Sequence, residues 1–179
     1  DDILAQYGAD VMRLWVASSD YRQDMRISKD MLGHLSQNYL KIRNTARYIL
    51  GNLFDFNPQT DRVAYAELPE LDKWALMKLN ELVAKVREGY DSYEFHTVFH
   101  AIHKFCVVDM SNFYLDVIKD RLYCDDTTGL SRRSAQTAMY NILSALVRML
   151  SPILCFTADE IWQAMPHTEE DDVRNVAYN

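Results

Sequence analysis

Three histidines stand at helical spacing in the middle of the chain and could bind a metal ion. His96 and His100 are four residues apart, and His103 follows three residues later, so the three can share one face of a helix. Two histidines at this spacing occur in zinc sites, but such sites need three or four ligands. No acid directly follows His96, and the three cysteines are far apart. We therefore expect partly exposed helix residues here and no metal site.

Two pairs of arginines could bind phosphate groups. Arg43 and Arg47 are four residues apart and belong to one helix face. Arg132 and Arg133 fall in the first turn of another predicted helix, where positive charge opposes the helix dipole unless an anion compensates. That anion could be a nucleic-acid phosphate or an acid such as those in the loop 124–130. The spacing leaves both interpretations open, and it places all four arginines off the apolar stripes.

No motif for catalysis is visible. The five glycines are scattered, so no glycine-rich phosphate loop is present, and no Ser or Cys lies in a nucleophile motif. Aromatic residues between 95 and 114 have the spacing of a helix core, which favours packing over base stacking. We predict no catalytic residue and no cofactor, and we expect helix surfaces to bind a large partner.

The composition is typical of a helical domain from a reducing compartment. Of 179 residues, 49% are hydrophobic, and only 5 are glycine and 4 proline, which favours helices over an all-β fold. Three widely spaced cysteines favour the cytoplasm. No run is long enough to span a membrane, and the first residue is not Met, which suggests a piece of a longer protein. The net charge of −7 counts against nucleic-acid binding but leaves room for a local basic face.

Apolar spacing divides the chain into three parts. Residues 1–27 contain a predicted helix over 9–19, followed by a weakly alternating stretch, 20–27, that predicts a short strand or extended linker. Residues 28–166 are expected to form a helical bundle. Residues 167–179 are acidic and have no periodicity, so they are predicted to be a tail or linker.

Four long helices are predicted within the bundle. Apolar residues recur at steps of three and four over 31–53, 71–86, 95–117 and 139–150. Helix caps are expected at Ser28, at Asp91 or Ser92, and at Ser131. Pro69 is expected to start a helix and Gly89 to end one. A capping box at Thr157 and Glu160 predicts the start of a shorter last helix. The predicted fold class is all-α: an up-down bundle of about four long helices preceded by a short helix-plus-strand segment.

Five stretches of the sequence look like motifs of one known family. They are YGADVMRLW (7–15), YLKIRNTARYILGNLFDF (39–56), SNFYLDVIKDRLY (111–123), RRSAQTAMYNIL (132–143) and TADEIW (157–162). In this order, and over essentially the whole chain, they resemble the anticodon-binding part of the isoleucyl-tRNA synthetases. The first and last stretches are similar in the valyl relatives, whereas KDRLY and RRSAQTA favour the isoleucyl family.

The resemblance implies a class I aminoacyl-tRNA synthetase that uses ATP to ligate isoleucine to its tRNA. The resembling domain performs none of that chemistry, so ATP, amino-acid and zinc sites are not expected on this chain. It implies instead a monomeric domain that binds the anticodon stem-loop of an isoleucine-accepting tRNA, with no membrane partner. Two alternatives stay open: the equivalent valyl domain, and an acidic helical bundle that binds proteins.

The resemblance also implies which residues contact RNA. Arg43 and Arg47 lie where the family's first anticodon-domain helix faces RNA, and Arg132 and Arg133 are expected backbone contacts. Lys119 and Arg121 are weaker candidates, because Asp116 and Asp120 can pair with them. A contiguous basic face on the first and fourth helices would favour RNA binding. Arginines that are all neutralised by acids would favour the protein-binding bundle.

Overall fold

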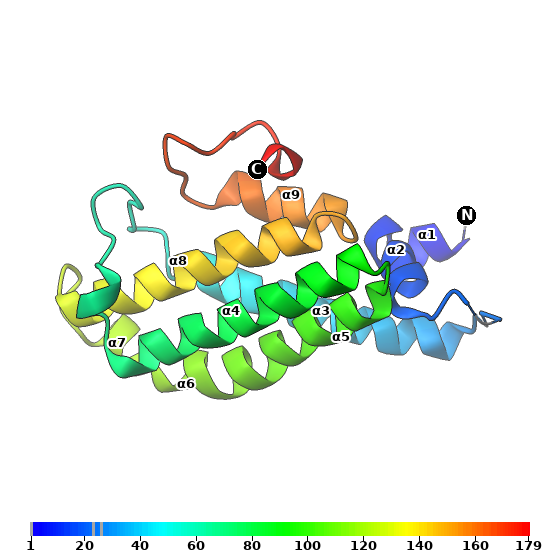
Figure 1. Ribbon diagram of the computed structural model, residues 1–179, viewed down its shortest axis with the longest axis horizontal. Helices are drawn as coiled ribbons and strands as arrows, with labels where there is room; N and C mark the ends of the chain where they lie inside the picture. Colours follow the sequence, from blue (N-terminus) through cyan, green and yellow to red (C-terminus); the bar gives the residue numbers. More distant parts are fainter. Residues whose placement is uncertain (1, 23, 26) are drawn as a thin grey trace.

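Four long helical rods form the body of the structure, and each runs opposite to the one before it (Figure 1). The computed structural model describes residues 2–22, 24, 25 and 27–179, and it contains no strand among them. The predicted all-α, up-down bundle is confirmed. Three rods are single helices: α3 (Lys29–Gly51), α4 (Glu70–Asp91) and α8 (Leu130–Leu150). The remaining rod, between α4 and α8 in the chain, consists of three consecutive elements: α5 (Phe95–Lys104), the π-helix η2 (Phe105–Tyr114) and α6 (Leu115–Val117).

Shorter helices cover the ends and one side of these rods (Figure 1). At one end lie α1 (Asp2–Tyr7) and α2 (Ala9–Ser18), which confirms the helix predicted over 9–19. At the other end lies α7 (Lys119–Tyr123), and α9 (Cys155–Ala164) packs along α8. The single turns η1 (Tyr65–Glu67) and η3 (Val176–Tyr178) complete the structure. Val176 is 2% exposed, so the end of the segment 167–179 packs onto the bundle.

The short strand predicted within 20–27 is wrong for the residues described there. Residues 20–22, 24, 25 and 27 form turn and irregular backbone, and the Asp20 carboxylate accepts a hydrogen bond from the Arg22 N–H at 3.1 Å. Residues 23 and 26 lie outside the described residues. A strand needs a second strand to pair with its backbone groups, and the flanking helices α2 and α3 offer none.

The predicted apolar stripes meet in one core. Ile42 of α3, Val86 of α4, Ile102 of α5 and Leu143 of α8 are all at most 2% exposed. Trp162 of α9 is fully buried in the same core, so α9 is part of the bundle. Removing these side chains from water is the main favourable term that holds the rods together. The burial of these apolar stripes also fixes how each helix is rotated about its axis.

Several helix ends differ from the prediction. The cap at Ser28 is confirmed, because its hydroxyl accepts from the Met31 N–H at 3.2 Å. Helix α4 continues past Gly89 and ends at Asp91, and Tyr93, two residues later, has a left-handed φ of 57°. A Cβ on Gly89 would lie 2.7 Å from a Val98 methyl group, so glycine there permits the close approach of α5.

The N-terminus of α9 is capped from a distant helix. Thr157, predicted to begin a capping box, lies inside α9. Its N–H and hydroxyl donate to the carboxylate of Asp10 on α2 at 2.7 and 2.5 Å. A buried carboxylate at a helix N-terminus satisfies free N–H groups and matches the helix dipole. Asp10 therefore ties the segment before α3 to the bundle.

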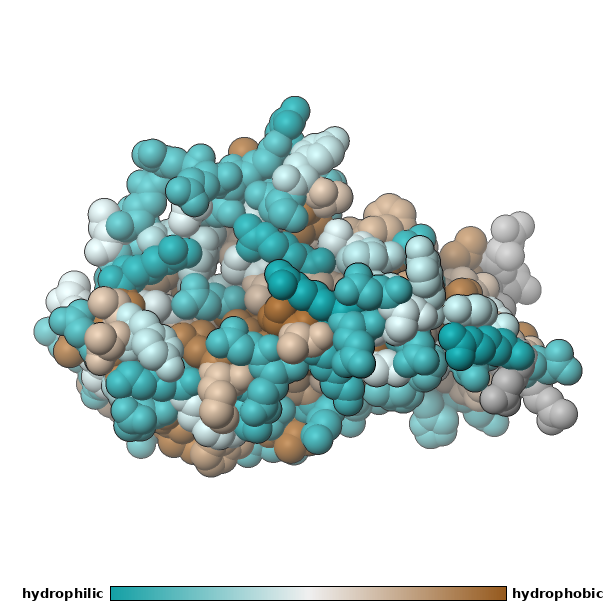
Figure 2. Space-filling view, in the orientation of Figure 1, coloured by the Kyte–Doolittle hydropathy of each residue, from teal (hydrophilic) through white to brown (hydrophobic). Residues whose placement is uncertain are grey.

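The visible surface is polar over most of its area. Figure 2 shows hydrophilic residues over the C-terminal segment and hydrophobic ones gathered at the lower left, near α6. Across the described residues, no helix is both long and apolar enough to cross a bilayer.

Candidate nucleic-acid interface

Helix α3 presents two arginines at the surface. Its buried stripe, which includes Ile42, Ala46 and Ile49, turns Arg43 and Arg47 away from the core. The Arg43 guanidinium lies 3.5 Å from the Glu160 carboxylate of α9, and these side chains are 42% and 67% exposed. Arg47 is exposed and forms no ion pair with any residue that the structure describes. Arg47 is thus a cation available to an outside partner.

A hollow of about 590 Å³ opens beside Arg47, at the end of the bundle where α3 and α7 end. We call it the α3–α7 hollow. Phe54 and Tyr123 line it, and they are 81% and 64% exposed. The exposed amide of Asn44 and the carboxylate of Asp125 also belong to its lining.

The α3–α7 hollow gathers chemical groups of the kinds that proteins use to bind unpaired RNA. An aromatic side chain that stacks on a base contributes about 1–3 kcal/mol to binding. Amides pair with exposed base edges, and a guanidinium binds a phosphate or stacks on a base. Neither Phe54 nor Tyr123 is among the RNA contacts predicted from the sequence. The signal that could have found them is position, because each lies at or beyond the end of a helix and Phe54 follows the end of its apolar stripe.

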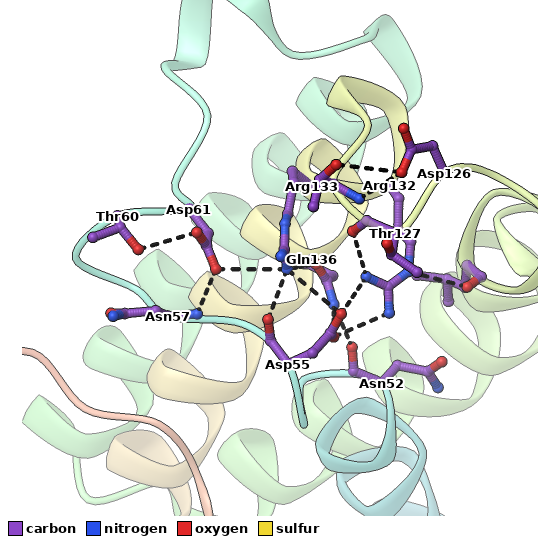
Figure 3. Close-up of polar contacts among 12 residues, drawn as sticks. Asn52, Asp55, Asn57, Thr60, Asp61, Asp126, Thr127, Arg132, Arg133 and Gln136 are labelled. Atoms are coloured by element: carbon purple, nitrogen blue, oxygen red, sulfur yellow. Dashed lines mark hydrogen bonds and ion pairs between the residues drawn. The ribbon is translucent and has the colours of Figure 1, made fainter.

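Three side chains of α8 converge on Asp55, in the loop after α3 (Figure 3). Arg132 donates to both carboxylate oxygens at 2.7 and 3.0 Å, and Gln136 donates to one of them at 2.8 Å. Arg133 donates to the Asp55 carbonyl at 2.8 Å and lies 3.6 Å from the Asp61 carboxylate. We call this group the Asp55 cluster. It fastens the loop after α3 to the first turn of α8.

The Asp55 cluster supplies the anion that the first turn of α8 needs. Cations near a helix N-terminus are unfavourable without one. The hydrogen bond from Arg132 holds the pKa of Asp55 below its ordinary 3.8. Arg132 also donates to the carbonyls of Leu122 and Thr127 at 3.2 and 2.9 Å, so its guanidinium points into the protein.

A buried carboxylate, that of Asp72, holds Arg121. Asp72 of α4 is fully buried and accepts from the Tyr114 hydroxyl at 2.7 Å and from Arg121 at 3.0 and 2.6 Å. Arg121 also donates to the hydroxyl and carbonyl of Ser131 at 3.1 and 2.7 Å. Ser131, predicted to cap α8, lies inside that helix instead and joins it to α7. Burying a charge is costly unless partners of this kind compensate it.

The remaining predicted contact, Lys119, lies on the surface. Its ammonium is 2.6 Å from the Asp116 carboxylate, and the two side chains are 52% and 62% exposed. The pairing of Lys119 with Asp116 is confirmed. Arg121, by contrast, pairs with Asp72 and not with Asp116 or Asp120.

The two predicted arginine pairs differ in their partners, although Arg47 and Arg132 both line the α3–α7 hollow. Arg132 and Arg133 pair with acids, and their partners are Asp55 and Asp61 rather than the acids of the loop 124–130. Arg132, predicted with the other three arginines to lie off the apolar stripes, is 5% exposed because the loop after α3 covers it. RNA contact by any of the six predicted residues stays a prediction.

Two of the three histidines of α5, His100 and His103, pack against the aromatic ring of Phe99. The rings of His100 and His103 lie 5.1 and 5.9 Å from that of Phe99. Burial, followed by the charges of Lys41 and His100, lowers the pKa of His103 from 6.5. Within the described part of the chain, no three His, Cys, Asp or Glu side chains are placed to hold a metal ion.

Similarity to known families decides what kind of domain this is. Residues 72–177, more than half of the chain, match the family described as the anticodon-binding domain of tRNA ligase. The chain belongs to this family. The matched range runs from Asp72 into η3, so it includes the partners of Asp55 on α8, while α3 precedes it.

Full-length relatives of this anticodon-binding domain confirm the resemblance to isoleucyl-tRNA synthetases. The chain is 56% identical over 170 residues to the isoleucine–tRNA ligase of Caldicellulosiruptor bescii, covering 95% of this chain and 18% of the relative. It is 54% identical over 173 residues to that of Syntrophotalea carbinolica, covering 97% and 19%. The chain thus spans about a fifth of the length of these relatives.

A solved structure shares the fold of this anticodon-binding domain. It is the ternary complex of Agrobacterium radiobacter K84 LeuRS with tRNA and LeuAMS, with a TM-score of 0.64 and 14% identity. The similarity covers 91% of this chain and 19% of that one. At this identity it shows the helical architecture alone.

Proposed function

We propose that this chain holds the anticodon stem-loop of an isoleucine-accepting tRNA within an isoleucine–tRNA ligase. Family membership and relatives that are 54–56% identical and bear that name support the proposal. The ATP-dependent ligation of isoleucine belongs to the remainder of the enzyme, and this chain contributes binding without a catalytic group or cofactor. We further propose that it acts as a monomer in the cytoplasm.

One observation carries the proposed interface: a free cation stands beside two exposed aromatic rings. Arg47, Phe54 and Tyr123 line the same α3–α7 hollow, and none of the three is needed to fill the core. In the proposed complex, bases that leave the stack of the anticodon loop rest on Phe54 and Tyr123. Arg47 takes the phosphate between them or a base edge, and Arg43 extends the basic face along α3.

The other predicted contacts act by positioning this interface. Arg132 and Arg133 hold the loop that carries Phe54, because both bind Asp55, the next residue. Arg121 holds α7, which carries Tyr123, against α4 and α8. We assign these three arginines to the framework and Lys119 to the exposed margin.

Two rival functions are less well supported. The equivalent valyl domain would account for the fold, but the relatives cited above are isoleucine–tRNA ligases. A protein-binding acidic bundle is favoured by the paired states of Arg121, Arg132 and Arg133. The match to the anticodon-binding family outweighs those pairings, because structural arginines on α7 and α8 are compatible with a separate RNA surface on α3.

The test is a titration with anticodon stem-loop RNAs that carry an isoleucine or a valine anticodon. We expect the isoleucine stem-loop to bind at least about tenfold more tightly, a difference of roughly 1.4 kcal/mol. Arg47→Gln should weaken the isoleucine stem-loop by about 1–3 kcal/mol. Arg87→Gln, on an exposed arginine of α4, is the matched control and should have little effect. Equal affinity for the two RNAs, or equal losses in the two variants, would overturn the proposal.

A further inference from the structure

A second, smaller hollow lies between α3 and α9, next to the proposed RNA surface. It measures about 280 Å³ and is lined by Arg43, Arg47 and Leu50 of α3 and by Glu160, Ile161 and Ala164 of α9. The two arginines are one helical turn apart and face the same hollow. We call it the α3–α9 hollow. Its cations continue the basic face that begins at the α3–α7 hollow, because Arg47 lines both.

Among the described residues that line the α3–α9 hollow, Glu160 is the one acid. Its carboxylate lies 3.5 Å from the Arg43 guanidinium, beyond ordinary hydrogen-bond length. The Glu160 side chain is 67% exposed and can leave this position without opening the core. Ion pairs exposed to this degree stabilise proteins weakly. Arg43 can therefore exchange its carboxylate for another anion at little cost.

The Arg43–Glu160 pair differs from the Asp55 cluster in the length of its contact and in its exposure. Arg132 is held by two short hydrogen bonds, at 2.7 and 3.0 Å, and its side chain is 6% exposed. Removing that carboxylate would leave a buried cation, so the pair is permanent. Arg43 has a single long contact and a side chain that is 42% exposed. An arginine and a carboxylate thus form one fixed pair, Arg132 with Asp55, and one exchangeable pair, Arg43 with Glu160.

We infer that Glu160 is a built-in competitor for the RNA backbone: its carboxylate occupies the phosphate position at Arg43 and yields to a phosphodiester when RNA binds. This inference rests on the proposed function and adds a residue of α9 to it. A phosphate binds a guanidinium as a bidentate acceptor and more strongly than a distant carboxylate does. A nearby Glu160 charge also repels RNA that does not fit closely enough to displace it.

The test compares Glu160→Gln with the unchanged chain in titrations of the isoleucine anticodon stem-loop at several salt concentrations. Removing the competitor should tighten binding about two- to fivefold at low salt, the range of an exposed ion pair. The log–log salt slope should steepen by up to about 0.7, because Arg43 no longer exchanges one anion for another. In an Arg43→Gln background, Glu160→Gln should change the affinity by much less.

Glu81→Gln is the matched control, since Glu81 is 58% exposed and pairs with Lys78 on α4. It makes the same change in net charge away from the α3–α9 hollow and should leave the affinity nearly unchanged. Equal tightening by Glu81→Gln would overturn the inference in favour of a net-charge effect. No change or weaker binding with Glu160→Gln, while Arg47→Gln still weakens binding, would overturn it and leave the proposed function intact. Failure of the unchanged chain and of every variant to bind RNA would overturn both the inference and the proposed function.

Discussion

Replacing Asp55 by Asn removes the carboxylate on which Arg132, Arg133 and Gln136 converge, while it keeps the size of the side chain. Arg132 loses its two charge-assisted hydrogen bonds, of 2.7 and 3.0 Å, and remains a cation that is 5% exposed. The unpaired charge, rather than lost packing, should dominate the effect.

The expected loss of stability follows from the burial of this pair. Breaking a fully buried ion pair by removing one partner costs about 3–5 kcal/mol. The Asp55 side chain is 25% exposed, so water reaches part of the pair. The Asn oxygen can still accept one hydrogen bond, so we expect a loss of about 2–3 kcal/mol in the free energy of unfolding. For a chain of this length, Tm should fall by roughly 4–12 °C.

The assay is urea unfolding followed by circular dichroism. Asp116→Asn is the matched control, because Asp116 pairs with Lys119 at the surface and should contribute less than about 1 kcal/mol. Adding Arg132→Met to Asp55→Asn should recover part of the loss, since no unpaired charge remains. A loss with Asp55→Asn no larger than that with Asp116→Asn would refute the structural role given to Arg132.

The Asp55–Arg132 pair also predicts that the free energy of unfolding depends on pH. The folded-state pKa of Asp55 is lowered from 3.8, first by the hydrogen bond from Arg132. Its contribution to stability is therefore fully present above pH 3.8 and is lost as the pH falls through the lowered folded-state pKa. The stabilities of the unchanged chain and Asp55→Asn should converge at acid pH. A constant difference down to acid pH would contradict this cause.

Three further predictions concern other parts of the fold. Asp10→Asn should lower the free energy of unfolding by about 1–2 kcal/mol, because its carboxylate caps α9 through Thr157; urea unfolding measures this, and an unchanged midpoint would argue against the cap. The pKa of His103, followed by NMR, should lie below 6.5, so protonation should reduce stability as the pH falls below 6.5, and His103→Gln should remove that slope. Incubation with a chelator should leave Tm unchanged, since His100 and His103 pack around Phe99; a marked fall would reinstate a metal site.

Local patterns predicted the helices because the information for a helix lies within a few residues. The stripe that begins at Met31 predicted α3, and Ser28 predicted its cap. The same approach failed at Gly89, where the glycine serves a contact with α5 rather than a helix end. It was also wrong in part over 20–27, where weak alternation predicted a short strand or extended linker, and the strand has no partner among the described residues.

The partners of charged residues could not be predicted because they lie far away in the chain. Two adjacent arginines in a first helical turn predicted a compensating anion, and the structure contains one. Its position, 77 residues before Arg132, is a property of the folded bundle. The cap of α9 comes from Asp10, 147 residues before Thr157. The α3–α7 hollow has the same origin, since Phe54 and Tyr123 become neighbours only when α3 and α7 end side by side.

The most direct test of the proposed interface is the fluorescence of 2-aminopurine placed in the anticodon loop of the stem-loop RNA. Its emission responds to stacking, and Phe54 and Tyr123 are the rings expected to stack on a base. Binding to the unchanged chain should alter the emission, and the Phe54→Leu, Tyr123→Leu double variant should lose that response. Phe156→Leu, on a ring of α9 that is 66% exposed, is the control and should keep it. An unchanged response in the double variant would contradict the proposed interface.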